Sequence, residues 1–200
     1  MIDLRLRAAA MTLAAAMPLA ACTTMDSGDA GMSGQSASAE GTVMVGGAAM
    51  YPSRSIVENA VNSRDHTTLV AAVKAAGLVD TLSGAGPFTV FAPTNAAFAK
   101  LPAGTVDTLL KPENLTTLQT VLTYHVVPGR VTAADLMQQI KAGGGSARLT
   151  TVQGGTLTAR MMGGRVMLVD AKGGMAHVTQ ADVMQSNGVI HVTDSVSLPG

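Results

Sequence analysis

Aromatic residues, cysteine and charged residues are all scarce in this chain of 200 residues. Aromatics make up 2% of it, tryptophan is absent and there is one cysteine. A single cysteine cannot form an internal disulfide, which excludes a disulfide-stapled mini-protein. The 13 basic and 13 acidic residues cancel, whereas nucleic-acid binding usually needs a basic face with stacking rings. We therefore expect no nucleic-acid partner.

Apolar residues, in contrast, are plentiful. They make up 47% of the chain, and charged residues make up only 13%. This composition argues against disorder of the whole chain. The length accommodates one domain with a sizeable core and additional segments.

The first 21 residues have the pattern of a bacterial lipoprotein signal peptide. Arg5 and Arg7 precede an apolar stretch, residues 8–20, that is too short to span a bilayer. The stretch ends in Leu-Ala-Ala-Cys, and this Cys22 is the only cysteine. A lipid on Cys22 would hold the mature protein at a membrane, in the outer membrane, facing the periplasm or at the cell surface. The alternative is an ordinary signal peptide followed by a chance cysteine.

A spacer is predicted to follow the signal peptide. Residues 22–51 are rich in Gly, Ser, Ala and Met and show no helical or strand period, which predicts a flexible, lipid-anchored tether. The domain itself is assigned to residues 52–200. Thioethers in the tether could bind Cu(I), or they could simply belong to a low-complexity segment. These are Met25, Met32, Met44 and Met50.

Helical patterns dominate the first part of the domain, and strand patterns dominate the last third. Short helices are expected over residues 55–61, 69–76, 96–98, 106–110, 112–122 and 133–137. Strands are expected over residues 88–92, 124–127, 149–152, 156–161, 166–170, 176–180 and 189–198. Helices followed by strands indicate an α+β domain and not alternating βαβ units.

Three segments of the domain resemble the fasciclin-like (FAS1) family. They read FTVFAPTNAAF at residues 88–98, YHVVPG at 124–129 and SNGVIHVTD at 186–194. The resemblance extends from about Ser55 to Pro199. It implies a single FAS1-like domain, in which antiparallel β-sheets form a wedge with helices packed on one side.

The resemblance also implies a function. FAS1 domains are known mainly from cell-adhesion and matrix proteins, so we expect a non-enzymatic adhesion domain of the cell envelope with a protein or polysaccharide partner. Some relatives in the wider family carry apolar molecules such as carotenoids. The alternative is therefore a carrier of an apolar small molecule.

Four polar residues in these segments are candidates for interaction: Asn95, Tyr124, His125 and His191. Three of them also have a structural interpretation, and that of His125 is a semi-buried ring with satisfied hydrogen bonds. Asn95 could satisfy backbone donors at a strand-to-helix corner, and Tyr124 at a strand start could bury its ring and bond locally. His191 and Asp194 lie three positions apart on one strand, which places them on opposite faces and argues against a catalytic His–Asp pair.

No catalytic or metal-binding motif stands out. The sequence has no Gly-x-Ser-x-Gly elbow and no phosphate-binding loop, and its four histidines are dispersed. We expect no enzymatic activity, no cofactor and no zinc. Methionines of the predicted hairpins could bind copper together with His177, or fill the core on one face and form an adaptable apolar surface on the other. They are Met161, Met162, Met167 and Met175.

Overall fold

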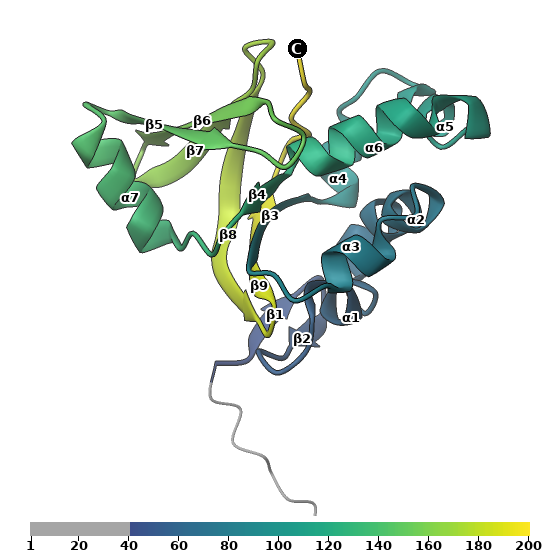
Figure 1. Ribbon diagram of the computed structural model, residues 1–200, viewed down its shortest axis with the longest axis horizontal. Helices are drawn as coiled ribbons and strands as arrows, with labels where there is room; N and C mark the ends of the chain where they lie inside the picture. Colours follow the sequence, from purple (N-terminus) through teal and green to yellow (C-terminus); the bar gives the residue numbers. More distant parts are fainter. Residues whose placement is uncertain (1–40) are drawn as a thin grey trace, which may run out of the picture. The chain divides into compact units, whose positions relative to one another are not determined.

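A seven-stranded sheet with seven α-helices forms the folded part of the chain (Figure 1). The computed structural model describes residues 41–200. The predicted signal peptide, the candidate lipidation site Cys22, and Met25 and Met32 therefore lie outside the described residues. The predicted α+β class is confirmed.

The folded part begins earlier than the sequence pattern indicates. Strands β1 (Val43–Val45) and β2 (Ala48–Met50) form an antiparallel hairpin within the region predicted as tether. Gly46 and Gly47 make its turn with φ of +57° and +75°, which glycine adopts without steric cost. Val45 and Met50 are buried in the core. The prediction of a flexible tether up to residue 51 is thus wrong for residues 43–50, because alternate apolar side chains and a diglycine turn suffice for a short hairpin.

Six short helices then gather on one side of the sheet: α1 (Ile56–Ala60), α2 (Thr67–Ala75), α3 (Val79–Ser83), α4 (Asn95–Ala99), α5 (Thr105–Leu109) and α6 (Leu115–Tyr124). Two 3₁₀ turns, Arg64–His66 and Pro112–Asn114, precede α2 and α6. A capping box formed by Ser55 and Glu58 starts α1. Helices of five residues are not stable alone, so packing must hold most of them in place.

The remaining elements are α7 (Ala133–Ala142) and the strands β3 (Phe88–Pro93), β4 (Val126–Pro128), β5 (Ser146–Thr150), β6 (Thr156–Met162), β7 (Arg165–Val169), β8 (Met175–Gln185) and β9 (Gly188–Thr193). The strand order in the sheet is β4-β3-β9-β8-β7-β6-β5. Strands β3 and β9 pair in parallel, and all other neighbours pair antiparallel.

Several elements differ in extent from their predictions. Tyr124 ends helix α6 and does not start a strand, because the apolar period of α6 continues through it. Helix α7 runs to Ala142, five residues beyond its predicted end. Strand β8 continues to Gln185, past irregularities in its pairing with β9. A strand that bulges loses its strict alternation, which hid this extension in the sequence.

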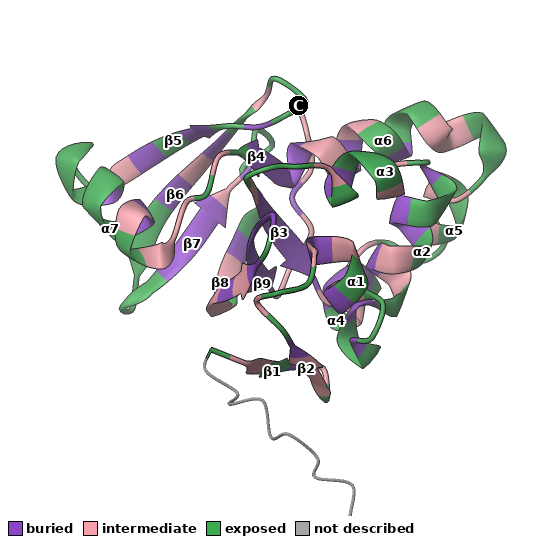
Figure 2. Cartoon of the chain, turned by 60° about the horizontal axis from the view of Figure 1, so that its bottom comes forward, coloured by how far each residue is buried: buried purple, intermediate pink, exposed green. Residues whose placement is uncertain are grey.

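Two apolar cores lie on either side of the central strands (Figure 2). The first lies between α1–α6, the β1–β2 hairpin and strands β3 and β9. The second lies between α7 and strands β5–β8. Strand β3 contributes to both by alternation, since Val90 and Ala92 belong to the first core and Phe91 to the second. We call the first the helical core and the second the sheet core. The helical half and the sheet half are the elements that surround each core.

Candidate functional site

The three segments that carry the family resemblance meet at the centre of the domain. They supply β3, β4 and β9, which are adjacent strands. The Phe91 N–H donates to His125 O over 2.9 Å, and Phe91 is paired with His191 on the other side. The fold thus brings His125 and His191, which lie 66 positions apart in the chain, to opposite sides of Phe91.

Tyr124 links α6 to two turns of the sheet. Its side chain is fully buried, and its hydroxyl donates to Thr156 O over 2.7 Å and accepts from the Ala171 N–H over 3.1 Å. A Cβ on Gly155 would lie 2.7 Å from the ring, so the turn before β6 approaches the ring as closely as only glycine allows. In this conformation the phenol is satisfied internally and a partner on the surface would not touch it.

His125 fastens the C-terminal segment to α6. Its Nδ1 donates to Val121 O over 2.8 Å, and its Nε2 accepts from the Ser197 N–H over 3.0 Å. One donor and one acceptor define a neutral ring protonated at Nδ1. The residue is 3% exposed.

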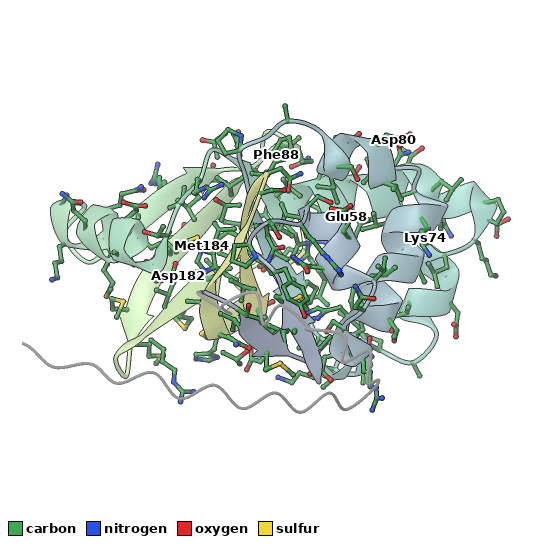
Figure 3. The ribbon with its side chains drawn as sticks, turned by 90° about the horizontal axis from the view of Figure 1, so that it is seen from below. Glu58, Lys74, Asp80, Phe88, Asp182 and Met184 are labelled. Atoms are coloured by element: carbon green, nitrogen blue, oxygen red, sulfur yellow. The ribbon has the colours of Figure 1, made fainter. Side chains whose placement is uncertain are left out.

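His191 is buried in the same manner. Its Nε2 donates to Val131 O over 2.9 Å, its Nδ1 accepts from the Asp182 N–H over 3.3 Å, and its ring stacks on Phe91 with centroids 5.5 Å apart. Asp182, on β8 near Met184 (Figure 3), has a φ of +58°. That left-handed conformation lets its carboxylate accept from the Ala133 N–H at the start of α7, over 2.7 Å.

Asp194 does not pair with His191, as the strand period predicts. Its carboxylate accepts from the His177 N–H over 2.8 Å and forms an ion pair with Lys100 at 3.5 Å. His177 belongs to the solvent-facing side of β8 and is half-exposed. The two histidines therefore serve different faces of the sheet.

Asn95 holds two helices together. Its Oδ1 accepts from the Thr68 N–H over 3.0 Å, and its Nδ2 donates to Arg64 O over 2.8 Å and to Thr67 Oγ1 over 2.9 Å. Helix α2 has no side-chain cap of its own, so Asn95, in the first turn of α4, supplies one from a distance. Thr94, not Asn95, caps α4 itself.

Burial governs the charge state of the central histidines. Desolvation lowers the pKa of His125 and of His191, and it outweighs the carbonyls of Val121 and Val131, which raise it. Both rings are therefore neutral at pH 7. In each ring the nitrogen that could accept a proton is already bonded to a backbone N–H, so in this conformation both histidines act as structural links.

Asn187 is a buried polar residue that links several elements of the helical half, and the sequence patterns did not single it out. Asn187 accepts from the Ile56 N–H over 3.0 Å and donates to Leu82 O and Gly84 O over 2.8 and 2.9 Å. It thereby joins the start of α1 to the end of α3. The SNG sequence reads only as a turn, because its long-range partners lie more than 100 positions away.

The methionines of the sheet are divided between its two faces. Met161 lies on the same face as the buried Ala159, whereas Met167 lies on the other face, directly opposite His177. Met162 and Met175 are 55% and 58% exposed. Among residues 41–200, no three side chains of His, Cys, Asp or Glu gather as metal ligands do.

The residues that carry the resemblance thus build the centre of an α+β domain. Residues 64–199 match the Fasciclin domain family, and the chain belongs to that family.

Relatives extend this assignment. Protein sll1483 of Synechocystis sp. is 50% identical over 160 residues, which cover 80% of this chain and 82% of that protein. The cell surface glycolipoprotein MPB83 of Mycobacterium bovis is 38% identical over 122 residues, which cover 61% of this chain and 48% of MPB83.

The fold is shared with a solved FAS1 domain pair from the insect cell adhesion molecule Fasciclin I. The TM-score is 0.64 at 20% identity, and the match covers 72% of this chain and 50% of that one. In the described part of this chain, residues 41–200, no helix has the length and apolarity needed to cross a membrane.

Proposed function

We propose that the protein is a non-enzymatic binding or adhesion domain of the bacterial cell envelope that mediates cell-surface or extracellular-matrix interactions. The observation that carries this proposal is the internal engagement of Asn95, Tyr124, His125 and His191. Side chains committed to backbone partners build a rigid scaffold, and binding then falls to the surfaces that this scaffold presents.

Anchoring at the membrane is the second part of the proposal. The signal-like first 21 residues and Cys22 support a lipid anchor, and MPB83 is a cell surface glycolipoprotein. Each buried CH₂ of an acyl chain contributes roughly 0.8 kcal/mol, so several chains hold firmly. Many anchored copies on one membrane would turn weak contacts with a protein or polysaccharide partner into avidity.

Fractionation of the native host, or of bacteria expressing the chain, tests the anchor. The unmodified chain should be found with the membranes, carrying acyl mass on Cys22, and a Cys22→Ser chain should be released. Beads coated with the unlipidated protein should adhere to envelope or matrix preparations in proportion to coating density. Equal release of both chains would refute the anchor, and absence of density-dependent adhesion would refute the adhesion role.

One structural feature favours the alternative, a carrier of an apolar small molecule. A cavity of about 40 Å³ lies between α1, α2, α6 and β3, lined almost entirely by apolar groups. A single water needs roughly 10–15 Å³, so the cavity has room for only a few groups the size of a water molecule. A carotenoid-like ligand would require α1 and α2 to separate from α6. Native mass spectrometry from the protein's own membranes decides the matter, since a bound organic mass would make it a carrier.

A further inference from the structure

The charges of the domain are not evenly distributed. Residues 136–169, which form most of α7 and all of β5–β7, contain four cations and no Asp or Glu, although the whole chain is neutral. The cations are Lys141, Arg148, Arg160 and Arg165. All four are exposed, and within the described residues none of the four forms an ion pair.

Three of these cations share one face of the sheet. Arg148 is directly opposite Thr158, Arg160 is opposite Met167, and Arg165 is opposite Met162. Directly paired residues and alternate residues of a strand point to the same side. Consecutive arginines are therefore diagonal neighbours about 7–8 Å apart, and together they form a line across β5, β6 and β7.

This line ends at an apolar hairpin tip. Met161 and Met162 are 37% and 55% exposed at the end of β6, and Gly163 and Gly164 close the turn with φ of +57° and +80°. The two methionines point to opposite faces of the ribbon, so the tip is apolar on both sides. Arg160 and Arg165 flank it. The β6–β7 hairpin thus combines a narrow apex of two methionines with two cations: Arg165 lies level with Met162, and Arg160 lies two positions further back.

We propose that the tip of the β6–β7 hairpin, Arg160 to Arg165, docks on an anionic lipid bilayer. The methionines enter the boundary between headgroups and acyl chains, while the arginines extend back to lipid phosphates along their apolar stems. An anionic membrane surface attracts unpaired cations that lie close to it. The hairpin lies on the side of the sheet away from α1–α6 (Figure 1), so those helices do not obstruct its approach.

A bilayer fits the hairpin better than an anionic polysaccharide does. A polysaccharide would engage the arginines but leave two methionines in water, whereas the bilayer interface accepts both kinds of group. Sugar rings commonly stack on aromatic side chains, and residues 136–169 contain none. The proposal does not depend on acyl chains at Cys22, because the contact is made by the folded domain itself.

A local fluorescent reporter tests the insertion. In the full chain carrying Cys22→Ser, a single new cysteine at Met162→Cys takes an environment-sensitive label. A matched chain carries the label at Val61→Cys, since Val61 is 45% exposed beside α1. With phosphatidylcholine vesicles containing phosphatidylglycerol, the label at 162 should shift to the blue and the label at 61 should not. Equal spectra at both positions, or a shift at 61 alone, would overturn the proposal.

Charge variants test the role of the arginines. Removing one cation near an anionic surface lowers binding about fivefold, so Arg160→Gln with Arg165→Gln should weaken the 162 signal roughly 25-fold. Lys74→Gln with Lys111→Gln removes the same charge from exposed positions in the helical half and should leave the signal unchanged.

Two further outcomes would count against the proposal. Equal weakening by both pairs of variants would mean that net charge alone attracts the protein. If a soluble sulfated polysaccharide changed the fluorescence of the label at 162 in the absence of vesicles, and bound as tightly as the vesicles do, the arginine face of β5–β7 would be assigned to a polysaccharide instead. Equal release of the unmodified chain and the Cys22→Ser chain from cells would refute the anchor but leave the vesicle result intact, so failure of the anchor and failure of the hairpin contact are distinguishable.

Discussion

The helical and sheet cores are held together by different means. In the helical half, helices as short as five residues are joined by side chains that bond distant backbone groups, with Asn95 and Asn187 as the main links. In the sheet half, backbone ladders connect β5 to β8, and side chains such as Tyr124 and Asp182 join these strands to α6 and α7. The helical half should therefore depend on a few buried polar groups, whereas the sheet half should tolerate changes on its outer face.

Charge follows the same division. The described helical half mixes both signs, while residues 136–169 carry cations alone. A ladder of backbone hydrogen bonds leaves outward-facing side chains without structural contacts, so strands β5–β7 can carry cations alone, although Asp135 on α7 and Asp182 on β8 belong to the same half. The difference indicates that one half maintains the fold and the other is available for contact.

Removing the polar link of the helical half should have the largest effect. Asn187→Ala deletes three hydrogen bonds and leaves the buried groups of Ile56 and Leu82 and the half-buried carbonyl of Gly84 without this partner, so we expect a loss of about 3–4 kcal/mol in the free energy of unfolding. Urea unfolding followed by circular dichroism measures it. Asn62→Ala, which removes one exposed bond to Glu58 O, is the matched control and should cost less than about 0.5 kcal/mol. Similar losses in both variants would contradict the proposed division.

The contrast also explains what could be read from the sequence. Helix periods and the alternation of strands are local, and they predicted most elements of both halves. The β1–β2 hairpin was missed because three-residue strands are too short to show a period. The role of Asn187 was missed because its partners are set by the tertiary fold, and no local pattern reports them.

Breaking the link between α6 and the sheet should have an intermediate effect. Tyr124→Phe keeps the ring packed but leaves Thr156 O and the Ala171 N–H without their common partner, so we expect a loss of about 2 kcal/mol. Adhesion of the folded variant, measured with coated beads at a temperature well below its midpoint, should be unchanged. Lost adhesion with unchanged stability would instead make the phenol a recognition group.

The candidate residues illustrate the limit of motif reading. Tyr124, His125 and His191 were identified as polar groups within distinctive segments, yet their burial follows from the adjacency of β3, β4 and β9. Strand order depends on contacts between residues up to about 100 positions apart, which one sequence does not display. Resemblance located the segments and left burial of Tyr124 as one of two interpretations, and the fold shows that these side chains face inward.

Acid should weaken the junction between the two cores. The pKa of His191 is lowered in the folded state, so below its ordinary value, near 6.5, the unfolded chain binds a proton that the folded chain does not. Stability is therefore present above about pH 6.5 and is lost as the pH falls, by up to about 1.4 kcal/mol per pH unit for each such histidine. Urea midpoints measured between about pH 7.5 and 5.5 should show this slope, and His191→Gln should reduce it. An identical slope in the variant would show that His191 does not contribute.

The smallest effect is expected at the surface ion pair between the end of α4 and the end of β9. Lys100, after α4, forms an ion pair with Asp194, after β9, at 3.5 Å, with side chains 56% and 34% exposed. Exposed pairs are screened by water and salt and typically contribute less than about 1 kcal/mol. Lys100→Gln should therefore change the urea midpoint by less than the equivalent of about 0.5 kcal/mol, at low and high salt alike. A loss several times larger that disappeared at high salt would mean that charge at the surface, and not the buried hydrogen bonds of β3 and β9, holds α4 against the end of β9.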